Sequence, residues 1–246
     1  EVPAAPPAPA AAVPATTPTD PVSLATGEFY FEEKPDIMSG GPMVLGFVRY
    51  YASRLNSGGP LRTNWSHNFL FTMTFPSSGN ISVTDNRGRV LTFQQAGGSF
   101  TPSSGNFINY QLVSTASGYT LGDPIENRFY NFNNSGVLTS IQDRSGNTHT
   151  LSYTGTNLTG IGDGLGRTLT LAYDSGNHLI SVTDGSRTAH YAYTETDLTG
   201  FTDVRGFVTT YAYDSSTGIA GLITKKTLPL GNIATSQVFD SNGHVT

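Results

Sequence analysis

The stretch Tyr173-Asp-Ser-Gly-Asn-His-Leu-Ile-Ser-Val-Thr-Asp184 is one unit of a repeat that runs through the second half of the 246-residue chain. Tyrosines recur there every 20 residues, and between them lies a series of aspartates that each begin a short, turn-like tripeptide. A fixed period indicates repeated structural units that bury their faces against their neighbours. The two series are Tyr153, Tyr173, Tyr193 and Tyr213, and Asp143, Asp163, Asp184 and Asp203.

Each unit is expected to be a strand, a tight turn and a second strand. Gly, Asn and Asp bound the unit, and they favour turns because Gly adopts positive φ and Asp or Asn side chains bond to nearby backbone. Alternation places Leu179 and Ser181 on one face of the second strand and Ile180 and Val182 on the other. No stretch of the second half sustains an apolar period of 3.6 residues. The sequence therefore predicts an all-β fold, an array of antiparallel β-hairpins in a curved sheet.

Composition narrows the classes of partner. Charged residues make up 13% of the chain and the formal net charge is −5. The largest basic cluster is the pair Lys225-Lys226, so we expect no nucleic-acid groove. No apolar run approaches the roughly 18–20 residues that span a bilayer. Because the chain has no cysteine, it has no disulfide, thiol nucleophile or thiolate metal site.

The first 19 residues are nearly all Ala, Pro, Val and Thr. Such a segment cannot form a packed core, and it is predicted to be an extended, disordered leader. It lacks the basic start and continuous apolar stretch of a signal peptide. Two explanations fit a chain that opens at Glu1: a mature product whose signal was removed, or a boundary within a longer sequence.

Three motifs precede the repeats: Asp20-Pro-Val-Ser-Leu-Ala-Thr-Gly-Glu28, Leu45-Gly-Phe-Val-Arg-Tyr-Tyr-Ala-Ser53 and Asn64-Trp-Ser-His-Asn68. Together with the repeats, they resemble the Rhs/YD-repeat family from about Asp20 to Thr246. The family usually has Gly where this chain has Asn64, so we expect an altered backbone there. The resemblance implies three parts: an Ala/Pro-rich leader at 1–19, an Rhs-like N-terminal β-region at 20–125 and a YD-repeat hairpin array at 126–246.

The resemblance implies a scaffold. In this family of bacterial toxins and related shells, the YD repeats coil into a hollow cocoon around a C-terminal toxic domain. This chain is therefore expected to form part of such a cocoon, secreted or on the bacterial cell surface. Many members release the toxic domain at an Asp-Pro-x-Gly-Leu motif, which is absent here.

The chain ends inside a unit, shortly after Phe239-Asp240, and this hairpin is expected to lack its returning strand. Two alternatives remain open. The chain is the N-terminal piece of a longer protein, or it is a short member that completes its last sheet by pairing with another chain. In either case the open β-edge is expected to meet further segments of the same long chain or a neighbouring copy.

The sequence predicts no catalytic residue, cofactor or metal site. No histidine belongs to a His-Glu-x-x-His motif, and no cysteine supports a mixed metal site. Trp65, His67 and Asn68 belong to the corner motif, where we expect structural roles: a buried anchor between the N-terminal strands and the first repeats, and side chains that bond to backbone.

The aspartates Asp143, Asp163, Asp184 and Asp203 are the weak calcium candidates. Calcium needs several oxygen ligands, whereas each unit offers one carboxylate beside a glycine-rich turn. An aspartate that begins a turn bonds to the amide two residues on, which explains the series without an ion. We favour the turn interpretation.

The tyrosine series is expected to form a row on one face of the sheet. Aligned aromatic side chains on successive hairpins usually pack across strands on the buried face. The alternative is a platform on which carbohydrate rings stack. With Phe129, Phe132 and Phe239, the series would make a longer aromatic stripe.

These observations favour a non-enzymatic, exported structural scaffold that encapsulates or displays a C-terminal effector. The alternative is a surface adhesin or filament subunit that assembles through strand pairing. A carbohydrate-binding or carbohydrate-processing protein is the third hypothesis.

Overall fold

The computed structural model describes residues 22–23, 25–55, 58–77, 79–103 and 109–246. These residues form 24 strands and no helix, which confirms the all-β prediction. The predicted leader at residues 1–19 lies outside the described residues. In the described part of the chain, no helix has the length and apolar character needed to cross a membrane.

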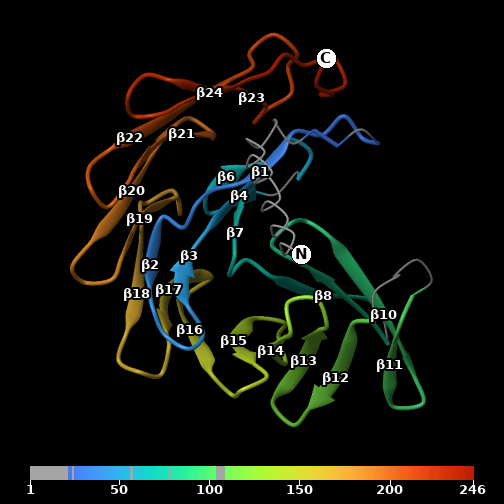
Figure 1. Cartoon of the computed structure of the whole chain (residues 1–246). Coiled ribbons are helices and arrows are strands. Elements are labelled where there is room, and N and C mark those ends of the chain that lie inside the picture. The colour runs from blue at the N-terminus through green and yellow to red at the C-terminus, as the bar shows by residue number, and fades with distance from the viewer. Residues whose placement is uncertain (1–21, 24, 56–57, 78, 104–108) are drawn as a thin grey trace, which may run out of the picture.

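Thirteen consecutive strands form one antiparallel sheet in which each strand pairs with the next along the chain. Figure 1 shows this sheet curving from the green and yellow strands to the red C-terminal ones. The predicted boundary between residues 125 and 126 falls inside it, between β13 and β14. The strands are β12 (Gln111–Thr115), β13 (Gly118–Asp123), β14 (Arg128–Asn133), β15 (Leu138–Asp143), β16 (Thr148–Thr154), β17 (Asn157–Gly162), β18 (Thr168–Tyr173), β19 (Leu179–Thr183), β20 (Thr188–Thr194), β21 (Asp197–Thr202), β22 (Val208–Tyr213), β23 (Ile223–Thr227) and β24 (Ile233–Ser236).

A β-bulge accompanies each repeat tyrosine. Ala172 pairs with Ser181 but Tyr173 pairs with Leu179, so Ile180 is an extra residue on β19. A bulge shifts the alternation of side chains by one position. Leu179 and Val182, three residues apart, are consequently both buried, while Ile180 is exposed. The alternation expected from sequence, with Ile180 and Val182 on the same face, was wrong at this bulge.

Strands β1 to β11, which we call the N-terminal β-region from here on, form four smaller sheets. In Figure 1 the 13-stranded sheet curves around strands β1 to β7, which lie against its inner face. The three-stranded sheet contains β1 (Tyr30–Glu32), β4 (Arg49–Ala52) and β7 (Trp65–His67). Two hairpins pair β2 (Ile37–Ser39) with β3 (Leu45–Phe47) and β5 (Gly58–Gly59) with β6 (Arg62–Thr63). The four-stranded sheet contains β8 (Thr72–Ser77), β9 (Asn80–Thr84), β10 (Val90–Ala96) and β11 (Ser99–Pro102).

One continuous hydrophobic core joins the N-terminal strands to the 13-stranded sheet. Phe47 and Trp65 from the N-terminal strands belong to the same buried cluster as Leu171, Leu198 and Leu222 from the repeats. Apolar burial of this extent is the main favourable contribution to folding. The inner face of the repeat sheet is thus covered by the N-terminal β-region.

The C-terminal residues fold back on the N-terminal β-region. Phe239 forms an isolated bridge with Val245, and the Val245 amide donates to the Gly27 carbonyl at 3.0 Å. The final hairpin therefore has a short return, contrary to the expectation that it would lack one. Strand β24 has only β23 as a partner among the described strands.

Candidate functional site

The interface between the N-terminal β-region and the repeats is organised by a buried ion pair. Arg49 on β4 donates to Asp36 from Nε at 2.6 Å and from Nη2 at 2.9 Å, and both side chains are 1% exposed. Tyr191 on β20 donates to the same carboxylate at 2.8 Å. The guanidinium lies 4.1 Å from the centre of the Phe201 ring on β21. A bidentate arginine–carboxylate pair is a strong and directional contact. Tyr191 and Phe201, which both contact this pair, connect it to two strands of the repeats.

A second acid extends this network to the end of the repeat sheet. The Tyr211 hydroxyl accepts from Arg49 at 3.0 Å and donates to Glu33 at 2.6 Å. Lys226 on β23 donates to the other oxygen of Glu33 at 2.6 Å. The network thus balances two acids against two bases inside the core, which is the arrangement that buried charges require.

The environment shifts the titration of these groups. Burial is the largest single effect on Arg49 and opposes its charge, but Asp36, Tyr211 and Glu33 together outweigh burial and hold the pKa of Arg49 well above its usual value. Burial raises the pKa of Asp36 against the opposing effect of Arg49. Burial alone would raise the pKa of Glu33, yet Arg49 and Lys226 together hold that pKa below its usual value. Burial raises the pKa of the Tyr211 hydroxyl well above 10, so this group stays protonated.

Trp65 is fully buried beside this network. Its Nε1 donates to the Tyr213 hydroxyl at 3.0 Å, and its ring meets the Tyr211 ring edge-on at 5.0 Å. It also packs against Tyr51 and Phe31 in the N-terminal strands. Trp65 therefore joins the N-terminal β-region to β22 near the C-terminal end of the sheet. The expected contact with the first repeats was wrong, because the sheet curves back on these strands.

The residue before Trp65 has a φ of 66°. Asparagine and glycine both adopt this left-handed conformation, so Asn64 occupies a backbone position that glycine would fit, and the altered backbone that we expected is not needed. Its side-chain amide donates to the carbonyl oxygens of Ser53, at 3.0 Å, and Gly221, at 3.2 Å. Asn64 thus adds a polar link between the two parts of the chain.

His67 and Asn68 bond to backbone, as expected for the corner motif. The Phe69 amide donates to Nδ1 of His67 at 3.3 Å. Asn68 accepts from the Val48 amide at 3.0 Å and donates to the Gly46 carbonyl at 2.9 Å. Burial lowers the pKa of His67 to about 3, so its imidazole is neutral at physiological pH.

The four repeat tyrosines lie on alternate strands of the sheet, half-buried against the common core. Three of their hydroxyls donate to a main-chain carbonyl: Tyr173 to Leu158 at 2.7 Å, Tyr193 to Leu179 at 2.6 Å and Tyr213 to Leu198 at 2.6 Å. Each bond links a unit to the carbonyl of a neighbouring hairpin. The four tyrosines therefore pack on the inner face of the sheet. The longer aromatic stripe is not uniform, because Phe132 is buried while Phe129 is 38% exposed.

The aspartate series forms the turns between hairpins. One oxygen of Asp163 accepts from the amides of Leu165 and Arg167, two and four residues on, and the same arrangement recurs at Asp143 and Asp203. Asp184 accepts in the same way from the amides two and three residues on. The second oxygen binds a side chain of the same turn, as in the Asp184–Arg187 pair at 2.6 Å. Among the described residues, no group of three or more His, Cys, Asp or Glu side chains is placed to hold a metal ion.

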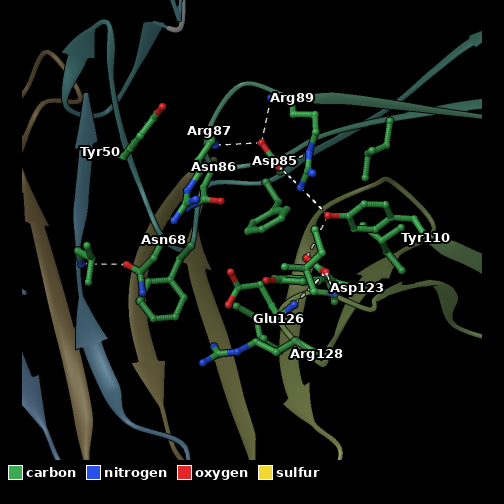
Figure 2. A pocket seen from close by; sticks show the side chains of 18 of the residues that line it. Tyr50, Asn68, Asp85, Asn86, Arg87, Arg89, Tyr110, Asp123, Glu126 and Arg128 are labelled. Carbon is green, nitrogen blue, oxygen red and sulfur yellow. Dashed lines mark hydrogen bonds and ion pairs between the residues drawn. The ribbon is translucent and has the colours of Figure 1, made fainter. Parts of the chain in front are cut away.

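A cavity of about 410 Å³ opens where β1, β4 and the β9–β10 turn meet the first strands of the repeat sheet. Figure 2 shows its polar lining. Arg89 pairs with Asp85 at 2.8 Å and donates to the Tyr110 hydroxyl. Arg87 pairs with Glu32 of β1 at 2.7 Å. These contacts tie the turn to strands on both sides of the cavity.

Two charged side chains in this cavity form no close ion pair with a described residue. Glu126 and Arg128 line it without an ion pair or a side-chain hydrogen bond to a described residue (Figure 2). Half-burial raises the pKa of Tyr50, on the opposite wall, to about 12. The cavity is lined by positively charged, negatively charged and aromatic side chains, a composition suited to holding a polar ligand.

The residues that matter most at the interface were not singled out from the sequence. Asp36, Glu33 and Lys226 follow no motif, and they meet only because the sheet curves back on the N-terminal strands. Arg49 did carry a signal. It stands in the alternating series Leu45, Phe47, Arg49 and Tyr51, whose other members are apolar or aromatic. A charge on the buried face of a strand must be paired.

Comparison with known proteins gives one match. Residues 19–93 match the model of a family described as a domain of unknown function, DUF6531. This segment contains β1 to β10 except for the last residues of β10, so it covers most of the N-terminal β-region and none of the repeat sheet. The match is loosely compatible with the start of an Rhs/YD-repeat protein. No curated protein matches the chain.

Proposed function

We propose that this chain is a non-enzymatic scaffold, the N-terminal segment of an exported Rhs/YD-repeat shell that encloses or displays an effector. The observation that carries this proposal is the buried network around Arg49. It holds the N-terminal β-region against the inner face of the 13-stranded repeat sheet, so that the sheet and the N-terminal β-region form one body. Because the N-terminal β-region already covers the inner face of this sheet, the effector would be surrounded by further hairpins that extend the same curved wall.

The repeat chemistry supports the same proposal. The aspartates are used to form turns, the tyrosines to connect neighbouring hairpins, and the charges at the interface to pair with one another. The most conspicuous polar side chains of the repeats thus have structural partners. Such a sheet can be extended by further units of the same design, because every unit meets only its neighbours.

The size of the native polypeptide and the protection of its remaining parts test this proposal. An antibody raised against this chain should detect, in the source cells, a polypeptide far larger than the 26.1 kDa of the chain itself. Limited proteolysis of that polypeptide should leave a stable body that retains an enclosed segment until the shell is denatured. A native polypeptide near 26 kDa, or one whose remaining segment is digested at once, would contradict the shell function.

One observation favours the alternative of an adhesin or filament subunit. Strand β24 lies at the edge of the sheet, and apolar side chains around it are exposed: Leu230 at 87%, Ile233 at 60% and Val238 at 67%. An exposed apolar edge is a template for pairing with another chain. Light scattering and electron microscopy of the purified chain at increasing concentration distinguish the two functions, because only a filament subunit should form regular fibres.

A further inference from the structure

A second cavity, of about 530 Å³, opens beside the β5–β6 hairpin and the turns that follow β14, β16 and β18. Aromatic side chains of Phe69, Phe71, Tyr153 and Tyr173 form part of its wall. Among the described residues, no aspartate or glutamate lines it, and Arg62 is the one lining residue with a permanent charge. We call it the Arg62 pocket. It is separate from the cavity of Figure 2, although Phe69 and Phe71 lie between the two.

Arg62 has a charge that the described residues do not balance. Its Nε is buried and makes no hydrogen bond, and the side chain forms no ion pair with a described residue. A buried donor without an acceptor costs free energy. The backbone adds a further cost, because Arg62 has a φ of 74°, a conformation that side chains other than Gly, Asn and Asp seldom adopt. Strained residues of this kind cluster at sites of function.

His67 contributes a second unused donor to the same wall. Because its Nδ1 accepts the Phe69 amide, the ring proton resides on Nε2. His67 is 1% exposed, and its hydrogen bond from the Phe69 amide uses Nδ1, which leaves the Nε2 proton for another acceptor. Tyr153, unlike the tyrosines of the next three units, also makes no hydrogen bond to a described residue through its hydroxyl. Three donors thus belong to residues that line one pocket, and the Arg62 Nε is the one among them that is buried without an acceptor.

We propose that the Arg62 pocket binds a carboxylate attached to an apolar or aromatic group. The planar guanidinium matches the two oxygens of a carboxylate, and the neutral His67 and the Tyr153 hydroxyl add uncharged donors. The aromatic rings cover the apolar part of the ligand, as in pockets of this size generally. This inference concerns a ligand and goes beyond the scaffold function.

Two sources share this chemistry, a free organic acid and the C-terminal carboxylate of a peptide. Titration calorimetry on the full chain with phenylacetate and with N-acetylphenylalanine separates them, and the matching amides test whether the charge is needed. We expect saturable binding of at least one acid, binding at least tenfold weaker for its amide, and a loss of affinity as salt is raised. Equal binding of an acid and its amide, or no saturable binding of either acid, would overturn the proposal.

Variants of Arg62 separate binding from folding. Arg62→Gly removes the guanidinium and fits a φ of 74°, so the urea midpoint should rise or stay constant while binding falls at least tenfold. Tyr153→Phe should weaken binding about threefold without lowering the midpoint. Arg144→Gln, which removes an exposed guanidinium in the β15–β16 turn, should leave binding unchanged. Acid binding that survives Arg62→Gly, or that falls as much in Arg144→Gln, would place the ligand elsewhere.

Discussion

Replacing Asp36 with asparagine should break the N-terminal β-region away from the repeats more readily than any other single charge removal at the interface. The carboxylate accepts three hydrogen bonds, two from Arg49 and one from Tyr191, all between 2.6 and 2.9 Å. Asparagine has nearly the same shape, but one of its terminal groups is a donor and would face the donors of Arg49. The substitution therefore removes both the charge and at least one hydrogen bond.

The expected loss follows from burial. Both partners are 1% exposed, so Arg49 would keep a charge inside the core without a counter-ion beside it. Breaking a buried ion pair by removing one partner costs about 3–5 kcal/mol. Arg49 retains the Tyr211 hydroxyl at 3.0 Å and the Phe201 ring at 4.1 Å, and Glu33 remains nearby. These contacts limit the loss in the free energy of unfolding to that range.

Urea denaturation followed by tryptophan fluorescence measures this loss directly. Trp65 is the one tryptophan of the chain, and it lies in the interface that the substitution weakens. The matched control is Glu32→Gln, which removes one charge from the exposed pair with Arg87. An exposed pair contributes about 0–1 kcal/mol. Two results would refute the importance of the buried pair for the interface. One is an equal effect of the two substitutions, and the other is a loss below about 1 kcal/mol in the free energy of unfolding for Asp36→Asn.

Three further predictions address the repeats and the corner motif. Tyr213→Phe removes a hydroxyl with two buried partners and should cost about 1–3 kcal/mol, whereas Tyr153→Phe should cost almost nothing; similar urea midpoints for the two variants would disprove the role of these hydroxyls. Both Gly136 and Gly146 have positive φ, but an added Cβ at Gly136 would lie 2.6 Å from a main-chain oxygen, whereas one at Gly146 would meet no atom within 4 Å. Gly136→Ala should therefore lower the melting temperature more than Gly146→Ala. The reverse order would contradict the packing of the turn at Gly136. Burial lowers the pKa of His67 to about 3, so the unfolded state binds the proton more tightly than the folded state. The free energy of unfolding should therefore fall by up to about 1.4 kcal/mol per pH unit as pH drops below about 6.5. A denaturation midpoint that is constant between pH 7 and pH 4 would show that His67 is not buried.

Acid should weaken the turns as well, at lower pH. The His244 amide donates to Asp240 and lowers the pKa of that carboxyl to about 2, and the Asn147 side chain lowers the pKa of Asp143. A depressed carboxyl pKa gives stability that is complete above the unfolded value near 3.8 and is lost as pH falls through the folded value. The turns are therefore expected to remain formed at pH 5, where His67 already reduces stability.

The sequence predicted the parts of the fold that depend on neighbours along the chain. The 20-residue period, the turn-forming aspartates and the inward row of tyrosines all arise from contacts between adjacent hairpins. The bulges were missed, because one extra residue such as Ile180 leaves no mark in an alternating pattern. A fixed period thus predicts which residues repeat but not how the register shifts within a unit.

Contacts between distant segments were beyond the same reasoning. Trp65 was correctly expected in the core, yet the repeat residues that it contacts, Tyr211 and Tyr213, lie near the C-terminal end of the sheet and not in the first repeats. The curvature of the whole sheet decides which unit returns to the N-terminal strands, and no local pattern encodes that curvature. The sequence did not point to Arg62 for a related reason. The lack of a partner for its charge can be recognised only when the residues around it are known.

A cut between the two parts of the chain tests most directly whether the N-terminal β-region and the repeats form one body. A specific protease site can be placed between Ser103 and Asn109, and cleavage can be verified by mass. The buried network predicts that the two pieces co-elute in size-exclusion chromatography without denaturant, and that Asp36→Asn lowers the urea concentration at which they separate. Pieces that separate in buffer alone would contradict the account.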